Sequence, residues 1–258
     1  MAQGFIWYEL MTTDQGAALD FYGRVVGWTH TRHPGGEPGG APYMVLEADG
    51  RGVGGVFQIA GEEMKDAPPM WLGYVGVADA DATADAIVAA GGSLRMGPAD
   101  IPGVGRFALA ADPGGAPFYI LAPDPARPSP EPVPPRTPGH CGWHELYAGQ
   151  GQEAAFGFYA SLFGWETVGE IDMGAMGKYR LFGTQGEALG GMMDKPADLP
   201  QAGWGYYFCV EGIDAAAERV RAGGGTIRMG PMQVPDGSFV LQGSDPQGAV
   251  FALISKER

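Results

Sequence analysis

Two segments of the chain place a carboxylate two residues after a tryptophan. They are Trp7-Tyr8-Glu9 and Trp143-His144-Glu145. Because side chains alternate along a strand, the tryptophan and the glutamate of each segment share one face if the segment is extended. Burial in an apolar cleft disfavours the charge of a carboxylate and makes it a stronger base. Glu9 and Glu145 are therefore the catalytic candidates, as a general base or as the hydrogen-bond acceptor for a ligand.

A structural role for the two glutamates is the alternative. Buried ionised carboxylates are usually paired, and Arg95, Arg228 or backbone amides could satisfy them. In that case the glutamates occur twice only because the chain contains a duplication.

The duplication covers nearly the whole chain. Motifs recur in one order in the two halves, and composition by itself cannot produce so many matches. The matches include Trp7 with Trp143, Phe21-Tyr22 with Phe158-Tyr159, Gly54-Gly55 with Gly190-Gly191, Trp71 with Trp204, and Asp112-Pro113 with Asp245-Pro246. The two halves therefore share one fold.

Between the halves, residues 123–139 carry eight prolines and few apolar side chains. This composition favours extended polyproline II and a semi-rigid spacer. We expect a first domain over 1–122, a linker over 123–139 and a second domain over 140–258. A Pro-rich recognition ligand is the alternative meaning of the linker.

Each half is expected to hold two β-α-β-β-β units, which makes the chain an α+β protein with four such units. Apolar periodicity and turn residues predict the elements of the first half. Its strands are expected over 5–11, 28–33, 42–48, 53–58, 71–77, 93–96, 106–111 and 117–122, and its helices over 15–26 and 80–90. Asp14 is expected to cap the first helix, and the repeat predicts the same order in the second half.

This arrangement resembles the vicinal oxygen chelate superfamily, which contains glyoxalases, bleomycin-resistance proteins and extradiol dioxygenases. The resemblance rests on the repeated unit, on a helix ending in Phe-Tyr with Gly-Trp shortly after it, and on the Asp-Pro-x-Gly turn before the last strand. It implies two tandem glyoxalase/bleomycin-resistance-like domains. In such relatives two units form a half-open barrel around a divalent metal ion.

The resemblance also implies metal-ligand positions, and the sequence departs from the family at them. The positions hold Trp7 and Trp143 on the first strand, Tyr74 and Tyr207 on the fifth, and Tyr119 and Ala252 on the eighth. Indole and alanine offer no ligand, so we expect no metal and no other cofactor. A divalent metal held by other residues is the alternative. The Arg that a glutathione-type glyoxalase carries four residues after its first ligand is replaced by Met11 or Tyr147.

An aromatic lining with one carboxylate in each half takes the place of the metal. The expected ligand-binding residues are Trp7, Glu9, Tyr74, Tyr119, Trp143, Glu145 and Tyr207. Tyr43 and Tyr179 can belong either to the core or to this cavity. The pairs Gly54-Gly55 and Gly190-Gly191 indicate either a strand bulge or a close approach of ligand to backbone, and a bulge is the commoner cause.

The remaining histidines and cysteines do not form a metal-binding pattern. His144 is expected to face away from Trp143 as a structural histidine, and His30, His33 and His140 are expected near the surface. No two histidines have ligand spacing. The two cysteines are too few for a disulfide framework and predict reduced thiols.

Composition narrows the partners. The net charge is −14, which disfavours nucleic acid and anionic membranes. No apolar run is long enough for a membrane span, and the first residues lack the pattern of a secretion signal. We therefore expect a cytoplasmic protein, monomer or homodimer, whose partner is a small molecule.

Three functions are compatible with these features. The first is a protein that binds a small aromatic or cationic organic molecule through stacking and cation–π contacts. The second is an enzyme of glyoxalase, dioxygenase or lyase type, either with a metal or metal-free through Glu9 or Glu145. The third is a regulatory interaction module whose pockets no longer bind anything.

Overall fold

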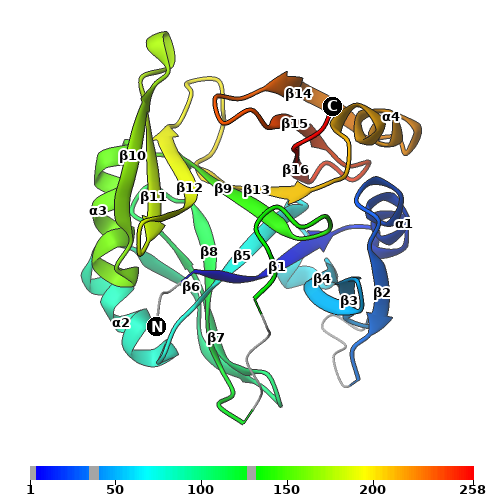
Figure 1. The fold of residues 1–258 in the computed structure, drawn as a ribbon. Helices are drawn as coiled ribbons and strands as arrows, with labels where there is room; N and C mark the ends of the chain where they lie inside the picture. Colours follow the sequence, from blue (N-terminus) through cyan, green and yellow to red (C-terminus); the bar gives the residue numbers. More distant parts are fainter. Residues whose placement is uncertain (1–3, 35–40, 127–131) are drawn as a thin grey trace. The chain divides into compact units, whose positions relative to one another are not determined.

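The computed structural model describes residues 4–34, 41–126 and 132–258 (Figure 1). The predicted order of elements is confirmed in both halves. The first half contains β1 (Phe5–Thr12), α1 (Gln15–Val25), β2 (Thr29–Arg32), β3 (Met44–Ala48), β4 (Arg51–Gln58), β5 (Met70–Gly76), α2 (Ala80–Ala89), β6 (Ser93–Ile101), β7 (Gly105–Ala111) and β8 (Pro117–Pro123). The second half contains β9 (Cys141–Ala148), α3 (Gln152–Phe163), β10 (Glu166–Asp172), β11 (Lys178–Thr184), β12 (Glu187–Asp194), β13 (Gly203–Cys209), α4 (Ile213–Ala222), β14 (Thr226–Gln233), β15 (Phe239–Ser244) and β16 (Val250–Ser255).

Each half forms one mixed eight-stranded sheet. The strand order is β2-β3-β4-β1-β5-β8-β7-β6 in the first half and β10-β11-β12-β9-β13-β16-β15-β14 in the second. The two orders are the same, so the α+β class with four β-α-β-β-β units is confirmed. None of the helices in the described part of the chain is long and apolar enough to cross a membrane.

Two of the helices, α1 and α2, have an aspartate cap at their first turn. The Asp14 side chain accepts a hydrogen bond from the Ala17 amide at 3.0 Å, and Asp79 accepts one from Ala82 at the same distance. An aspartate at this position satisfies one of the amides that a helix leaves unpaired at its first turn. The predicted cap Asp14 is therefore confirmed.

Compact packing follows a different division from the two halves of the sequence. Unit 1 consists of Met1–Ile6, Gly73–Pro132 and His144–Gly205, and unit 2 consists of Trp7–Leu72, Val133–Trp143 and Tyr206–Arg258. Helix α2 packs beside α3 in unit 1, and α1 packs beside α4 in unit 2. Each unit thus draws one β-α-β-β-β unit from each half. The boundaries 1–122 and 140–258 describe the repeat. That each half also folds by itself is an expectation from the sequence alone, and the packing of the units favours the opposite outcome.

A buried hydrogen-bond network joins the two halves inside unit 2. The Trp71 indole N–H donates to the Tyr22 hydroxyl at 2.9 Å, and this hydroxyl donates to the Asp245 carboxylate at 3.1 Å. The other Asp245 oxygen accepts from the Ala249 amide at 2.9 Å. Burial raises the pKa of both Tyr22 and Asp245. The repeated Phe-Tyr, Trp and Asp-Pro motifs therefore have a structural role.

Unit 1 contains the same network with the halves exchanged. The Trp204 indole donates to the Tyr159 hydroxyl at 3.0 Å, and Tyr159 donates to Asp112 at 3.2 Å. Asp112 also accepts from the Ala116 amide at 2.8 Å, and burial raises its pKa. In each unit the tyrosine and the aspartate come from different halves, so the network fastens one half to the other.

The two glycine pairs coincide with bulges and also make room for tyrosine rings. In β4, Gly54 pairs with Leu46 and Gly52 pairs with Glu47, which leaves Val53 as the extra residue of a bulge. A Cβ atom on Gly55 would collide with the Tyr43 ring, and one on Gly191 would collide with the Tyr179 ring. The bulge interpretation is confirmed. At Gly55 and Gly191 the close approach comes from these tyrosine rings, and at Gly54 and Gly190 it comes from the backbone oxygens of Tyr8 and His144.

The end of the Pro-rich segment is folded onto unit 2. The Thr137 hydroxyl donates to the Pro134 carbonyl at 2.6 Å, and the Trp28 indole donates to the Gly139 carbonyl at 2.7 Å. Arg136 has a φ of 65°, which is uncommon for a residue with a side chain. For residues 132–139 the interpretation as an extended spacer is therefore wrong, and residues 127–131 of the expected linker lie outside the described residues.

Candidate functional site

The seven expected ligand-binding residues divide between the two units. Unit 1 contains Tyr74, Tyr119 and Glu145, and unit 2 contains Trp7, Glu9, Trp143 and Tyr207. The glutamates and tyrosines of this set are buried, and the two tryptophans are half-buried.

Glu145 lies in a small cluster of tyrosines in unit 1. Its carboxylate accepts hydrogen bonds from the Tyr147 hydroxyl at 2.7 Å and from the Tyr179 hydroxyl at 2.9 Å. Tyr147 follows Glu145 by two residues on β9, and alternation along the strand places both on one face. Tyr179 reaches the carboxylate from β11 because its ring crosses Gly191, the residue of β12 that pairs with Glu145.

This arrangement gives Glu145 partners that the sequence did not assign to it. Arg95 and Arg228, the partners considered from the sequence, are exposed. Charge-assisted hydrogen bonds from two phenols stabilise a carboxylate in a buried place. Glu145 is thus held in a fixed position, as an acid–base group or a hydrogen-bond acceptor would need to be.

Tyr74 and Tyr119 form a stacked pair in unit 1. They are paired residues of the parallel strands β5 and β8, and their ring centroids lie 4.2 Å apart at an interplanar angle of 12°. The Phe107 ring lies 6.0 Å from Tyr119. Leu109 of β7 pairs with Tyr119 on the other side. In this copy the fifth-strand and eighth-strand positions are filled by two large rings in contact.

The corresponding positions of the second half, in unit 2, have smaller and more polar side chains. Ala252 of β16 pairs with Tyr207 of β13 and with Gln242 of β15, so the three residues lie side by side on one face. The Gln242 amide donates to the Tyr207 hydroxyl at 2.6 Å. Ala252 stands where the first half has Tyr119, and Gln242 stands where it has Leu109. The second copy therefore has less ring volume and one more polar group on this face.

Trp143 packs against the same face. With Val234 it covers a buried apolar cluster of Tyr207, Cys209, Val240, Ala252 and Ile254. The Arg136 guanidinium carbon lies 5.8 Å from the centre of the Trp143 ring, within the range of a cation–π contact. The structure thus brings together Trp143 and Tyr207 as predicted, and adds Gln242 and Arg136.

Trp7 has a different polar contact from Trp143. Its indole N–H donates to the Tyr43 hydroxyl at 3.0 Å. A Cβ atom on Gly52 would lie 3.3 Å from the Trp7 ring, so the ring lies over β4. Glu9, two residues later, is 8% exposed. The Tyr43 and Tyr179 rings have the same place in the two copies, because each lies over the glycine that pairs with the glutamate of its half, Gly55 with Glu9 and Gly191 with Glu145.

His144 is a structural residue in unit 1. It is buried, its Nδ1 atom donates to the carbonyl of the bulge residue Leu189 at 2.7 Å, and its ring stacks on Phe5 at 4.5 Å. Burial lowers the pKa of His144 to about 4. The ring is therefore neutral at pH 7, in agreement with the structural role predicted for it.

The two thiols lie in unit 2 and are not activated, with Cys209 buried and Cys141 partly buried. Burial raises the pKa of Cys141 to about 12 and that of Cys209 to about 11. A thiol with such a pKa is protonated and weakly nucleophilic at pH 7. Both cysteines are free, as predicted from the sequence.

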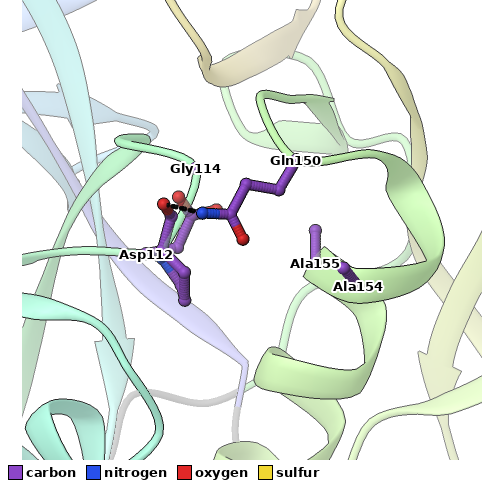
Figure 2. Close-up of a pocket in the computed structure, with 6 residues that line it drawn as sticks. Asp112, Gly114, Gln150, Ala154 and Ala155 are labelled. Atoms are coloured by element: carbon purple, nitrogen blue, oxygen red, sulfur yellow. Dashed lines mark hydrogen bonds between the residues drawn. The ribbon is translucent and has the colours of Figure 1, made fainter.

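A small pocket beside Asp112 in unit 1 does not extend the site. Figure 2 shows the Gln150 side chain reaching toward the 112–114 turn, where its amide donates to the Pro113 carbonyl, while Ala154 and Ala155 lie on helix α3. The cavity measures about 10 Å³, which is room for at most one water molecule. The Asp112 carboxylate is already engaged with Tyr159 and Ala116, so the pocket belongs to the structural network.

The residues at the family's ligand positions do not fit a catalytic metal. Trp7, Trp143 and Ala252 offer no lone pair to a divalent ion, whereas open metal sites use imidazole and carboxylate. In residues 4–34, 41–126 and 132–258, no three His, Cys, Asp or Glu side chains gather in a way that could hold a metal. We therefore assign no catalytic step to a metal ion.

Comparison with known proteins agrees with the fold. A model of the Glyoxalase/Bleomycin resistance protein/Dioxygenase superfamily matches residues 4–120 and 138–253. The protein "Putative glyoxylase CFP32" of Mycobacterium bovis is 31% identical over 249 residues, which cover 96% of this chain and 93% of that protein. "Anthracycline biosynthesis protein DnrV" of Streptomyces peucetius is 30% identical over 270 residues, covering 96% and 91%.

Solved structures share the fold at low sequence identity. The Mn(II)-bound glyoxalase from Novosphingobium aromaticivorans has a TM-score of 0.65 and 16% identity, with 98% of this chain and 82% of that chain covered. The 2,3-dioxygenase LapB from Pseudomonas sp. KL28 has a TM-score of 0.63 and 13% identity, with 100% and 94% covered. Because the family model matches both halves and relatives at 30–31% identity cover nearly the whole chain, the chain belongs to the Glyoxalase/Bleomycin resistance protein/Dioxygenase superfamily.

Proposed function

We propose that this protein binds a small aromatic or cationic organic molecule without the help of a metal. The observation that carries the proposal is the set of side chains at the family's ligand positions. In unit 2, Trp143 packs against a buried apolar cluster that contains Tyr207 and Ala252, so aromatic and apolar side chains stand at these positions in place of metal donors. Large aromatic walls with a few placed polar groups are the usual composition of a small-molecule site.

The second half is the better candidate for the binding surface. There Ala252 replaces a large ring, and Gln242 adds a hydrogen-bonding amide next to Tyr207. In the first half Tyr119 stacks on Tyr74 and occupies the equivalent position. Trp7 stands at the family's first-strand ligand position and Glu9 follows it by two residues on the same face, so both belong to the proposal.

The net charge of the chain and the names of similar proteins support a small-molecule partner. A net charge of −14 favours a small-molecule partner over nucleic acid or an anionic membrane. One relative is named for anthracycline biosynthesis and another as a glyoxylase, and both names refer to small organic compounds. We place the protein in the cytoplasm, as a monomer or homodimer.

Calorimetric titration with 2-naphthol tests the proposal. We expect saturable binding by the wild-type protein, and a loss of about 1–3 kcal/mol in Trp143→Ala because a stacking ring is removed. Ala252→Tyr copies the first half into the second and should abolish binding, whereas Ala252→Ser changes the volume little and serves as the control. Equal binding by all four proteins would remove Trp143 and Ala252 from the site.

A second function, acid–base catalysis, is favoured by the cluster around Glu145. A buried carboxylate fixed by the Tyr147 and Tyr179 hydroxyls is suited to remove a proton from a bound carbon acid. The test is turnover of the adduct of methylglyoxal with a thiol, with metal content measured on the same sample. We expect Glu145→Gln to lower kcat by about 10²–10⁴-fold if Glu145 is the base. No turnover by the wild-type protein would count against this second function.

A further inference from the structure

A cavity in unit 2 lies beside the folded end of the Pro-rich segment. It has a volume of about 370 Å³ and is lined by Arg136, Pro138, Val210, Glu211, Ile254, Ser255, Lys256 and Glu257. Val210 directly follows β13, and Ile254 and Ser255 end β16. Ile254 also belongs to the apolar cluster that Trp143 covers. The cavity and the surface proposed above therefore share one wall residue.

Arg136 is the residue of this lining with an unmet hydrogen-bonding need. Its Nη2 atom donates to Asp236 at 3.0 Å. Its Nη1 atom is buried and has no acceptor among the residues that the structure describes. A buried charged donor without an acceptor is costly, and such groups are rare unless a water, an ion or a ligand supplies the acceptor.

The position of this guanidinium is fixed by its surroundings. The side chain is 17% exposed, and its guanidinium carbon lies 5.8 Å from the centre of the Trp143 ring. The backbone of Arg136 is in the left-handed region, with the Thr137–Pro134 hydrogen bond holding the adjoining turn. Strained backbone of this kind is often found where a side chain is held for a function.

The charges around the cavity restrict the class of ligand. Arg136 and Lys256 are the cations of the lining. Both lie near enough to the Cys209 thiol for their positive charge to lower its pKa, against the larger effect of burial, which raises it. Glu211 and Glu257 also line the cavity, and Asp236 holds the other side of the guanidinium. These three carboxylates disfavour a highly charged anion such as phosphate. A single carboxylate matches the planar guanidinium well and adds only one negative charge.

We propose that this cavity binds the carboxylate of an aromatic monocarboxylic acid through Arg136. The carboxylate accepts a hydrogen bond from the Arg136 guanidinium, and the aromatic ring packs against Val210, Ile254 and Pro138. The inference rests on the proposed function, because it supplies the polar end of a ligand whose binding that function assumes. It adds an anionic preference, in contrast to the cationic option left open there.

Three naphthalene probes of equal ring size test the inference by calorimetry: 2-naphthoate, 2-naphthamide and 2-naphthylmethylammonium. We expect the wild-type protein to bind them in that order of decreasing affinity. Arg136→Met should weaken 2-naphthoate at least ten-fold, and Arg136→Lys should weaken it less. Asp236→Asn should strengthen it several-fold, because the variant keeps the arginine and removes a competing carboxylate.

Arg180 provides the matched control in unit 1. It also lies over an aromatic ring, with its guanidinium carbon 4.9 Å from the centre of Phe156. Arg180→Met should leave all three affinities unchanged. A thermal unfolding curve for each variant shows whether it is folded, and if Arg136→Met does not fold, the Asp236→Asn result decides.

The possible results distinguish a failure of the carboxylate site from a failure of the proposed function. If the three probes bind equally well and neither Arg136→Met nor Asp236→Asn changes their affinities, this inference is overturned and the proposed function stands. If the ammonium probe binds more tightly than the carboxylate, the inference is overturned as well. If none of the probes nor 2-naphthol binds, the proposed function fails together with the inference.

Discussion

The networks around Tyr22 and Tyr159 agree to within 0.1 Å, whereas the residues around the two repeated glutamates have diverged. In unit 2 the Trp71–Tyr22 and Tyr22–Asp245 distances are 2.9 and 3.1 Å, and in unit 1 the matching distances are 3.0 and 3.2 Å. Glu145 is followed by the hydrogen-bonding Tyr147, and Glu9 is followed by Met11 at the same position.

This contrast indicates which parts of the repeat carry structure and which can carry specialised chemistry. A network that fastens one half to the other is needed in both units, because each unit contains one tyrosine and one aspartate from different halves. The surroundings of a binding or catalytic carboxylate are needed only where that carboxylate is used. The second copy, with Tyr147, Gln242 and Ala252, is therefore the one in which we propose that a ligand binds.

Separating the halves should have the largest effect. Tyr22 of the first half donates a hydrogen bond to Asp245 of the second, and Tyr159 of the second half donates one to Asp112 of the first. Each compact unit is built from both halves, so a fragment of residues 1–125 or of residues 139–258 contains only part of each core. We expect neither fragment to unfold cooperatively, and their mixture to regain the near-ultraviolet circular dichroism of the whole chain. Two fragments that each melt cooperatively would show that the halves are independent domains.

Acid should then distinguish the two copies through His144, whose equivalent in the first copy is Tyr8. The pKa of His144 is about 4 in the folded protein, and its ordinary value is 6.5. Between these values the unfolded chain binds a proton that the folded chain does not, so stability falls as the pH drops from 6.5 to 4. The slope is about 1.4 kcal/mol per pH unit, or about 3 kcal/mol in total.

The variant His144→Asn should lose this slope. Asparagine keeps a donor for the Leu189 carbonyl but does not titrate, so urea unfolding at pH 7 and pH 5 should give closer free energies than in the wild type. Asp112 and Asp245, whose pKa values are raised by burial, act in the opposite direction but do so in both proteins. Tyr8→Phe should leave the acid slope intact. An unchanged slope in His144→Asn would assign the acid sensitivity to other groups.

The shared network should respond equally in its two copies. Tyr22→Phe and Tyr159→Phe each remove one hydroxyl that joins an indole to an aspartate, and each leaves buried polar groups without that partner. We expect a loss of about 1–3 kcal/mol of unfolding free energy in each, measured by denaturant titration at pH 7. Losses that differ by more than a factor of two would mean that one unit depends on this network and the other does not.

The smallest effect is expected where the copies already differ. Tyr147→Met gives the second copy the residue of the first and removes one hydrogen bond from Glu145. We expect a loss of about 0.5–1.5 kcal/mol of unfolding free energy, because Tyr179 still holds the carboxylate. Met11→Phe is the control and should change stability without affecting Glu145. A loss comparable to that of Tyr159→Phe would place Tyr147 among the structural residues of unit 1.

The sequence predicts the elements because each is determined by short-range patterns. Alternation along β1 and β9, the cap at Asp14 and the turn residues are local signals, and the repeat strengthens the prediction of the strands. The pairing of Tyr22 with Asp245 cannot be predicted in the same way. Since Asp112 and Asp245 occupy the same place in the repeat, the sequence permits a tyrosine to pair within its half or across halves.

The sequence predicts only those residues of the site that lie on one strand. Trp143 and Glu145 follow from alternation, and Tyr147 lies on the same face by the same rule. Gln242 requires the register of β15 against β16, which places it opposite Ala252. Arg136 comes from a segment whose composition favours an extended spacer, and its position depends on a left-handed backbone that the residue type disfavours.

The division into units also has a consequence for synthesis on the ribosome. Unit 1 is completed once Gly205 has left the exit tunnel, because its other segments precede that residue. Unit 2 needs Tyr206–Arg258 to cover Phe21 and Tyr22, whose rings contact Phe251. The side of α1 that carries these rings therefore stays without this cover until residues 206–258 are translated. Translation proceeds at about 5–20 residues per second, so the delay lasts many seconds. During this interval the rings of Phe21 and Tyr22 lack the Phe251 contacts that the finished unit provides.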